Sequence, residues 1–454
     1  MKISTIAIAG MLLIGQSLFA VPRLDRDVQA FLNSDGVADR PMSVLITYKR
    51  NITIPKRPYH RSFHSEIQRA LMQSTRAQEQ ALFQGPLAVA ATKKRTYWIL
   101  NGTAAELNRT ALRSLSSHPN IASISNGRHL MRIPRPQVAP APTPPEPYTY
   151  GMRKVGVPEL RQKYPQFDGS GIRVGILDTG IDATHPDLVG KVVLYKDFTA
   201  ANDPKPSDGH GHGTHCAGTI AGGSTSGTSI GVAPKASLVI GKIFDANGST
   251  TDEALVAAMQ WMADPDGDPA TNDFPALVSN SWGDSSAFNT RDPQDDPFCM
   301  ILENWVKLGI LPVFAAGNDG PDAGTVGTPG GCPMALTVGA TDSRDGIAPF
   351  SSRGPAKWKS NDLFKPNVSA PGVAIRSAKP GGGYQLMSGT SMATPHVAGV
   401  MAILYQANPK MTVDEAGKAV LAGVADLGVT GPDMFFGAGR VDVTKSVDTM
   451  KQNY

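Results

Sequence analysis

"IRVGILD", at residues 172–178, is a short and nearly continuous apolar run that ends in Asp178. Strands covered by protein on both faces have this pattern. Four similar runs follow: SLVIGKIF (237–244), ALVSNSW (276–282), ILPVFAAGN (310–318) and ALTVGA (335–340). Helical patterns lie among them at 212–222, 251–263, 298–308 and 391–406. The alternation predicts an α/β fold of three layers, a mainly parallel sheet with helices on both faces.

Polar residues stand where this sheet would bind a ligand, at the carboxyl ends of its strands. Asp178 ends the first strand and Asn318 ends the fourth. A third residue, Ser391, lies in SGTSMATPHVAG (388–399), ahead of a helical pattern that contains Pro395. Proline is tolerated in the first turn of a helix, so we expect Ser391 at a helix N-terminus. Backbone N–H groups there stabilise negative charge.

These residues are of the types that acyl transfer requires. DGHGHGTHCAG (208–218) places His212 at a helix start among glycines. A hydroxyl nucleophile, a base of near-neutral pKa and a carboxylate that orients the base correspond to Ser391, His212 and Asp178. Asn318 and the Ser391 N–H are candidate oxyanion donors. Taken singly, each residue also fits a plainer role as a helix cap, turn former or solvated side chain.

The motifs DTGID (178–182), GHGTHCAG (211–218) and GTSMATPHVAG (389–399) resemble the three active-site motifs of the subtilisin-like serine proteases. The resemblance covers about 148–445. It implies a secreted serine endopeptidase with Asp178, His212 and Ser391 as its triad and Asn318 as oxyanion donor. Protein or peptide substrates would be the partners, and no cofactor would be required.

The same resemblance implies a primary specificity pocket between two strands and a glycine floor. Its residues would be Ser281, Trp282, Gly283, Ala316, Gly317 and Gly327. Because glycine leaves room, we expect a preference for large apolar residues just before the cut bond (P1). Asp319 at the rim would admit basic residues as well.

Composition divides the chain into four parts. Residues 1–20 have Lys2, an apolar stretch and small residues near Ala20, which predicts a cleaved signal peptide and a location in the medium or the periplasm. An uncleaved anchor is the alternative, although the stretch is short for one. No later apolar run is long enough to span a membrane. Residues 133–147 contain seven prolines and predict an extended linker before the catalytic domain, 148–454.

Between these parts, residues 21–132 resemble the family's propeptide, which inhibits the enzyme until it is degraded. An α+β domain is expected at about 41–130, with strands at 43–48, 96–102 and 121–125 and helices at 63–84 and 104–117. Residues 21–135 carry 18 Lys/Arg and 7 Asp/Glu, whereas 136–454 carry 24 and 32. The opposite charges favour docking of the two parts, with a cut between about 126 and 145. A nucleic-acid partner is disfavoured, because the basic part is separable from the working domain.

The three cysteines predict one disulfide and one leftover thiol. Cys299 and Cys332 flank a strand and a loop and are candidates to pair, although sequence alone does not settle connectivity. Cys216 would then be a small packing residue rather than a nucleophile. Asp187 matches a calcium ligand of many relatives, but the loop that would complete the site has Ser and Thr, including Thr225, where an Asn is expected. Structural calcium and a metal-free loop both stay open.

Two other functions compete with this interpretation. A catalytically inactive subtilase-fold binding protein would need a broken triad, and all three residues are present. A nucleotide-binding α/β domain would need a G-x-G-x-x-G or P-loop signature after a strand, and GILDTG (175–180) lacks that spacing.

Overall fold

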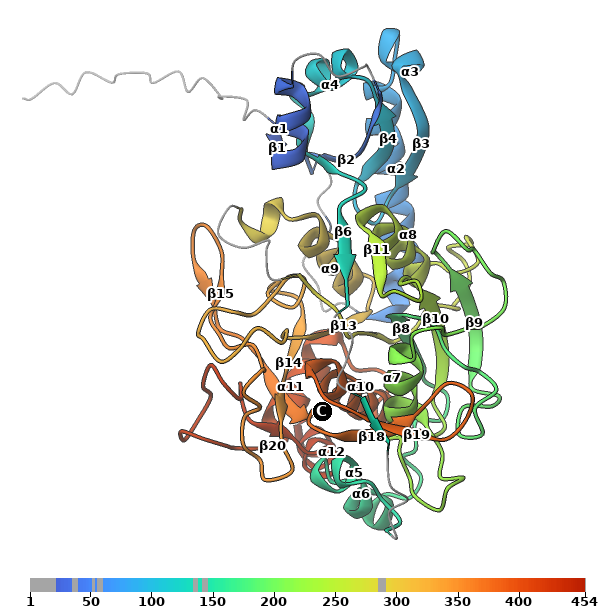
Figure 1. Ribbon diagram of the computed structural model, residues 1–454, viewed down its shortest axis with the longest axis vertical. Helices are drawn as coiled ribbons and strands as arrows, with labels where there is room; N and C mark the ends of the chain where they lie inside the picture. The colour runs from blue at the N-terminus through green and yellow to red at the C-terminus, as the bar shows by residue number, and fades with distance from the viewer. Residues whose placement is uncertain are drawn as a thin grey trace, which may run out of the picture.

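The computed structural model describes residues 22–34, 40–50, 54, 60–133, 138–140, 146–284 and 291–453. The predicted signal peptide lies outside them. A small N-terminal domain stands on one side of a larger α/β domain (Figure 1). The mixed α/β class expected from the sequence is confirmed, with a large, mainly parallel sheet and a separate small α+β sheet.

The large sheet has nine strands in the order β20-β21-β17-β14-β13-β12-β8-β10-β9, all parallel except for the edge pair β20 and β21. The five expected strands form its centre. Three of them stop short of their predicted ends, because the chain leaves the sheet after Lys242, Asn280 and Ala315. The strands are β8 (Arg173–Asp178), β9 (Val192–Asp197), β10 (Ser237–Lys242), β12 (Leu277–Asn280), β13 (Leu311–Ala315), β14 (Leu336–Thr341), β17 (Val368–Pro371), β20 (Val424–Ala425) and β21 (Arg440–Val441).

Helices cover both faces of this sheet and bury two apolar cores. One core includes side chains of α7 and α10, and the other includes side chains of α8 and α9. The four expected helices agree with the structure to within one or two residues. The helices of this domain are α5 (Tyr150–Lys154), α6 (Val157–Lys163), α7 (His212–Ala221), α8 (Asp252–Ala263), α9 (Pro297–Lys307), α10 (Thr390–Ala407), α11 (Val413–Ala422), α12 (Val443–Asn453) and the 3-10 turn η2 (Pro293–Asp295).

The N-terminal domain is a five-stranded sheet in the order β1-β5-β2-β4-β3, with helices packed against it. Its elements are β1 (Arg23–Leu24), α1 (Arg26–Asn33), β2 (Met42–Tyr48), η1 (Arg61–Phe63), α2 (His64–Leu82), α3 (Pro86–Ala90), β3 (Ala91–Tyr97), β4 (Gly102–Leu107), α4 (Arg109–Leu115) and β5 (Ile121–Asn126). The expected strand at 96–102 and helix at 104–117 are wrong in part. The apolar residues 98–100 form a turn, and the next strand runs to Leu107.

That turn explains the error, because its apolar residues are buried against the large domain. Ile99 and Leu100 are fully buried in the core that contains α8 and α9. The Ile99 carbonyl accepts a hydrogen bond from Asn304 of α9, at 2.8 Å. Residues 98–100, which the sequence predicts as part of a strand, therefore form a contact between the N-terminal domain and the large domain.

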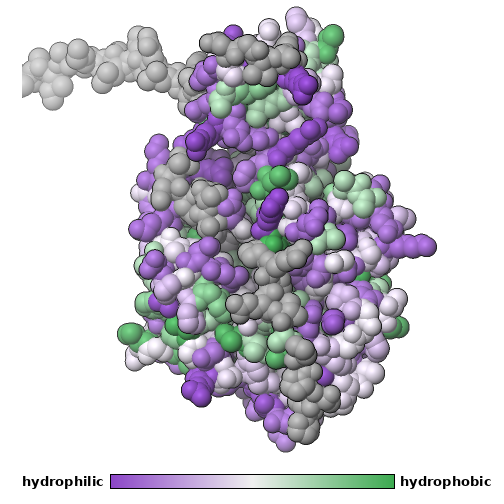
Figure 2. Space-filling view, viewed as in Figure 1, coloured by the Kyte–Doolittle hydropathy of each residue, from purple (hydrophilic) through white to green (hydrophobic). Residues whose placement is uncertain are grey.

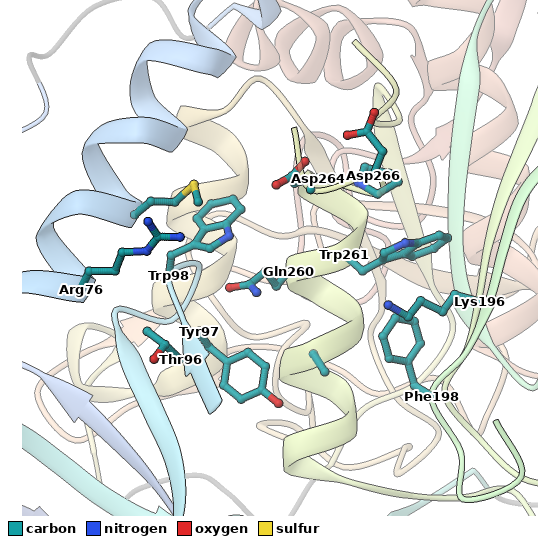
Figure 3. Close-up of a pocket in the computed structure, with 14 residues that line it drawn as sticks. Arg76, Thr96, Tyr97, Trp98, Lys196, Phe198, Gln260, Trp261, Asp264 and Asp266 are labelled. Atoms are coloured by element: carbon teal, nitrogen blue, oxygen red, sulfur yellow. The ribbon is translucent and has the colours of Figure 1, made fainter. Parts of the chain in front are cut away.

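The interface also pairs basic groups of the N-terminal domain with acidic groups of the large domain. Ion pairs join Arg23 to Asp295, Arg50 to Glu303 and Arg95 to Glu253. Figure 2 shows many hydrophilic side chains on the visible surface of the N-terminal domain. Between α2 and α8 lies a cavity of about 530 Å³, lined by Arg76 and Trp98 on one side and by Trp261 on the other (Figure 3). The basic N-terminal part and the acidic C-terminal part of the sequence therefore form ion pairs where the two domains meet.

Two short strands attach the end of the N-terminal domain and the linker to the large domain. β6 (Leu130–Arg132) pairs antiparallel with β11 (Ser249–Thr251), as Figure 1 shows beside α8. β7 (Val138–Pro140) pairs antiparallel with β19 (Tyr384–Met387), which also pairs with β18 (Ile375–Ala378). A further hairpin joins β15 (Ala356–Lys357) and β16 (Asp362–Leu363). The linker therefore forms a short strand at 138–140 that pairs with the large domain.

Cys299 and Cys332 form a disulfide, and Cys216 is a buried free thiol. The bond ties α9 to the loop before β14. Among the described residues, no helix combines the length and the apolar composition that a membrane crossing requires.

The disulfide closes a loop with a sequence separation of 33 residues. Its loss should lower the free energy of unfolding by about 3–4 kcal/mol, because the unfolded chain regains loop entropy. We expect Cys299→Ser/Cys332→Ser in a Ser391→Ala background to unfold at lower guanidinium concentration than its parent. Reductant should destabilise the parent and leave the double variant unchanged; equal midpoints for the two proteins would contradict the prediction.

Candidate active site

The centre of the candidate site is a buried contact between Asp178 and His212. Asp178 is the last residue of β8, and His212 is the first residue of α7. The His212 Nδ1 lies 2.7 Å from Asp178 Oδ1, which also accepts a hydrogen bond from the Thr179 N–H. The two side chains are 2% and 1% exposed. A carboxylate in this position fixes both the tautomer and the orientation of the imidazole.

Ser391 is the second residue of α10, at the expected helix N-terminus. Pro395 lies in the second turn rather than the first, so the sequence-based placement of the proline is wrong by one turn. A proline there cannot donate the usual hydrogen bond to the carbonyl of Ser391. The Ser281 hydroxyl donates to that carbonyl instead, at 2.9 Å. The helix therefore continues through Pro395 because a neighbouring strand supplies the missing donor.

The Cys216 sulfur lies between the histidine and the serine. It is 3.9 Å from His212 Nδ1 and 3.5 Å from the carbonyl oxygen of Ser391. Burial raises the pKa of the Cys216 thiol, which suits the packing role expected for it. Cys216 thus contacts both His212 and the backbone of Ser391, which places Ser391 near the buried Asp178–His212 pair. The Ser391 hydroxyl donates to the Ser281 carbonyl at 3.1 Å, and within the described residues no hydrogen bond joins it to the His212 ring.

Asn318 lies beyond the end of β13, beside the start of α10. Its Oδ1 accepts hydrogen bonds from the N–H and the hydroxyl of Thr390, at 2.9 and 3.0 Å. These contacts occupy the Oδ1 atom of Asn318, so its Nδ2 amide is the donor group available to a ligand. A side chain at Gly389 would place its Cβ 3.5 Å from Asn318 Nδ2 and 3.6 Å from the Ser391 nitrogen. Glycine therefore keeps open the space between two donors that suit an oxyanion.

The predicted pocket residues lie where β12 and β13 end. Ser281 contacts Ser391, as described above, and Trp282 is buried with its ring edge-on to Phe314, at 5.3 Å. Gly283 lies against Thr328, since a Cβ there would meet the Thr328 oxygen at 3.0 Å. The residues expected as walls and floor are linked by a hydrogen bond from the Gly327 N–H to the oxygen of Ala316, at 3.1 Å.

Gly317 has a φ of +108°, and a Cβ there would lie 2.7 Å from the Ser352 hydroxyl. No larger residue fits this position without displacement. The backbone of Asp319, the expected rim residue, is held by a hydrogen bond to the same hydroxyl, at 3.1 Å.

The surroundings of Asp187 do not fit a calcium site. Its Oδ1 accepts from the Thr225 N–H and its Oδ2 from the Tyr384 hydroxyl, both at 2.7 Å. The Arg376 guanidinium lies 3.9 Å from the centre of the Tyr384 ring. Calcium needs six to eight oxygen ligands. Here both oxygens of the Asp187 carboxylate accept hydrogen bonds from the protein, and the positive charge of Arg376 lies nearby.

Comparison with known proteins agrees with this geometry. A sequence model of the subtilase family matches residues 169–439. Serine protease AprX of Bacillus subtilis (strain 168) is 35% identical over 302 residues, which are 62% of this chain and 66% of the relative. Thermitase of Thermoactinomyces vulgaris is 36% identical over 311 residues, 67% of this chain and 99% of the relative. Subtilisin E of Bacillus subtilis (strain 168) is 31% identical over 355 residues, 77% and 81%.

The chain therefore belongs to the subtilase family, and it is a serine endopeptidase. The match spans just under two thirds of AprX but nearly all of thermitase. Sequence reasoning missed one functional group of the site: the Ser281 hydroxyl as the partner of the Ser391 carbonyl. The signal was present, because Pro395 in a helical pattern always leaves a carbonyl that needs another donor.

Burial alone would lower the pKa of His212, but the adjacent Asp178 carboxylate, together with Cys216, holds it well above 6.5. We expect NMR titration of the full-length Ser391→Ala protein to show a His212 pKa above 6.5. Asp178→Asn should lower this pKa, because burial remains and the carboxylate is gone. His215, which burial keeps at a pKa of about 3, is the internal control. A His212 pKa unchanged by Asp178→Asn would contradict the prediction.

Proposed function

We propose that the protein is a broad-specificity endopeptidase, exported to the medium or the periplasm and made as a precursor. Ser391 attacks the peptide carbonyl, His212 takes the serine proton, and Asp178 holds the imidazole. The Asn318 amide and the Ser391 N–H bind the oxyanion. His212 then gives that proton to the leaving amine as the peptide bond breaks, and water hydrolyses the acyl-enzyme to free Ser391. The observation that carries the proposal is the buried hydrogen bond between Asp178 and His212. Cys216 contacts both His212 and the first turn of the helix that contains Ser391.

Export is supported by the sequence of residues 1–20 and by the disulfide. Disulfides persist in oxidising compartments and are rare in the cytosol of mesophiles. A metal is not part of the proposed reaction, and the hydrogen bonds of Asp187 argue against calcium at that residue.

Replacement of the nucleophile and of the oxyanion donor tests the mechanism. Ser391→Ala should abolish labelling by a fluorophosphonate and casein hydrolysis. Asn318→Leu should retain labelling and lower kcat by about 10²–10³, the range known for a donor of this kind in subtilisin, a member of the same family. A catalytically inactive binding protein, the alternative function, predicts no labelling and no hydrolysis in the unsubstituted protein.

We also propose a preference for large apolar P1 residues, supported by the glycine-lined walls near Gly283 and Gly327. A peptide library should show Phe, Tyr, Leu and Met enriched before the cut bond. Gly327→Val should lower kcat/KM for Phe at least tenfold and spare Ala, because the added methyl groups fill the floor. Selection of Gly or Ala alone by the unsubstituted enzyme would contradict the preference.

The N-terminal domain acts, in this proposal, as an intramolecular inhibitor. Its last strand, β6, pairs with β11, and the Ile133 N–H donates to the Gly248 oxygen at 2.8 Å. The linker strand β7 then pairs with β19, which leads directly to Ser391. Because β6 pairs with β11 and β7 pairs with β19, the linker is anchored to the large domain on both sides, and we expect the maturation cut between Ile133 and Val138.

The pH dependence of release tests this inhibition. His129 of the N-terminal domain has its pKa raised to about 9, mainly by Asp252 and further by Asp284 and Asp27. A free histidine titrates near 6.5, so the contact favours docking fully below pH 6.5 and loses its contribution as pH rises through 9. After the cut, the domains should separate more readily at pH 9.5 than at pH 7 in size-exclusion chromatography. His129→Ala should reduce the difference; an unchanged difference would exclude His129 as its source.

A further inference from the structure

The end of the N-terminal domain shows how the large domain holds an extended peptide. Beyond the β6–β11 pairing, the Asp252 N–H donates to the His129 oxygen at 3.3 Å, and the Glu253 N–H donates to the Gly127 oxygen at 3.1 Å. These two amides open α8 and have no partner within the helix. Backbone hydrogen bonding to the segment therefore continues beyond β11 to the first residues of α8.

Side chains alternate along this segment, as in any extended chain. Met131 and Ile133 are each 6% exposed, whereas Leu130 is 59% exposed. His129 lies two residues before Met131, just ahead of β6, and its side chain is 45% exposed. Its Nδ1 is 3.6 Å from Asp252 Oδ1. The large domain thus presents an apolar surface to Met131 and a carboxylate, Asp252, to His129.

Among the described residues of the large domain, Asp252 has no close cationic partner. Its side chain is 17% exposed, and no hydrogen bond from the described residues reaches its buried Oδ1. The neighbouring Arg291 pairs with Asp296, at 2.9 Å, and is therefore engaged elsewhere. Asp252, Asp284 and Met131 line one cavity of about 710 Å³. Burial raises the pKa of Asp252, and His129 opposes that rise.

We propose that Asp252 forms a cation-selecting subsite that takes a Lys or Arg side chain of a protein substrate at the position now held by His129. The inference rests on the proposed function, because the subsite is accessible only after the N-terminal segment leaves the cleft. Lys and Arg are longer than His and carry several N–H donors, so they close the 3.6 Å gap and donate a charge-assisted hydrogen bond. The selected cation lies two residues before the side chain in the Met131 position, and upstream of the cut bond.

Peptide substrates test the subsite in the matured enzyme. Each peptide keeps residues 127–133, continues with a preferred P1 residue, and carries Lys, Ala or Glu at position 129. We expect kcat/KM to be roughly three- to tenfold higher for Lys than for Glu, with Ala between them. Asp252→Asn should remove the difference, and high salt should narrow it. Lys and Glu at position 130, on the exposed face, are the matched control and should differ less than twofold.

Equal kcat/KM for Lys and Glu at position 129, in an enzyme that cleaves these peptides, overturns the subsite and leaves the proposed function intact. Loss of all peptide and casein cleavage overturns the proposed function. In that case amide exchange of the full-length Ser391→Ala protein decides the subsite. Exchange at residues 248–253 should be slower with His129→Lys than with His129→Glu, and Asp252→Asn should make the two equal. Identical exchange without Asp252→Asn overturns the inference.

Discussion

The buried hydrogen bond between Asp178 and His212 is the contact on which the site depends, and two glycines set its length. The turn after β8 and the start of α7 approach so closely that a Cβ at Gly213 would lie 2.2 Å from the Gly180 oxygen. A side chain at Gly213 would push the helix, and His212 with it, away from the strand. The parallel sheet then brings Asn318 to the same edge, because the carboxyl ends of its strands all face one way.

The N-terminal domain is held by two different kinds of contact. Its apolar turn at 98–100 continues the core of α8 and α9 and contributes burial, which is insensitive to salt. The ion pairs around it are partly exposed and therefore worth little individually. They orient the domain rather than hold it. The antiparallel strand β6 then carries that orientation to the cleft, where backbone pairing is independent of side-chain identity.

Much of this arrangement could be predicted from the sequence, because buried parallel strands and capped helices have strong local patterns. The five central strands, the four helices and the residues around Asp178, His212 and Ser391 were all expected. The rest depends on partners distant in the chain. The apolar pattern of Trp98–Leu100 predicts a strand, because the sequence does not show that α9 packs beside it. The prolines around Val138–Pro140 predict a spacer, because the sequence does not show that β19 pairs with it. The two donors to Asp187, the Thr225 N–H and the Tyr384 hydroxyl, come from a loop and from β19, so the residues around Asp187 in the sequence do not reveal them.

One consequence follows from the pairing of both β6 and β7 with strands of the large domain. While the chain is intact, the occupant of the cleft is present at a high effective concentration that dilution of the protein does not change. A single cut between Ile133 and Val138 converts that contact into an ordinary equilibrium between two molecules. After such a cut, a lower protein concentration would favour separation of the two parts, whereas in the intact chain it would not.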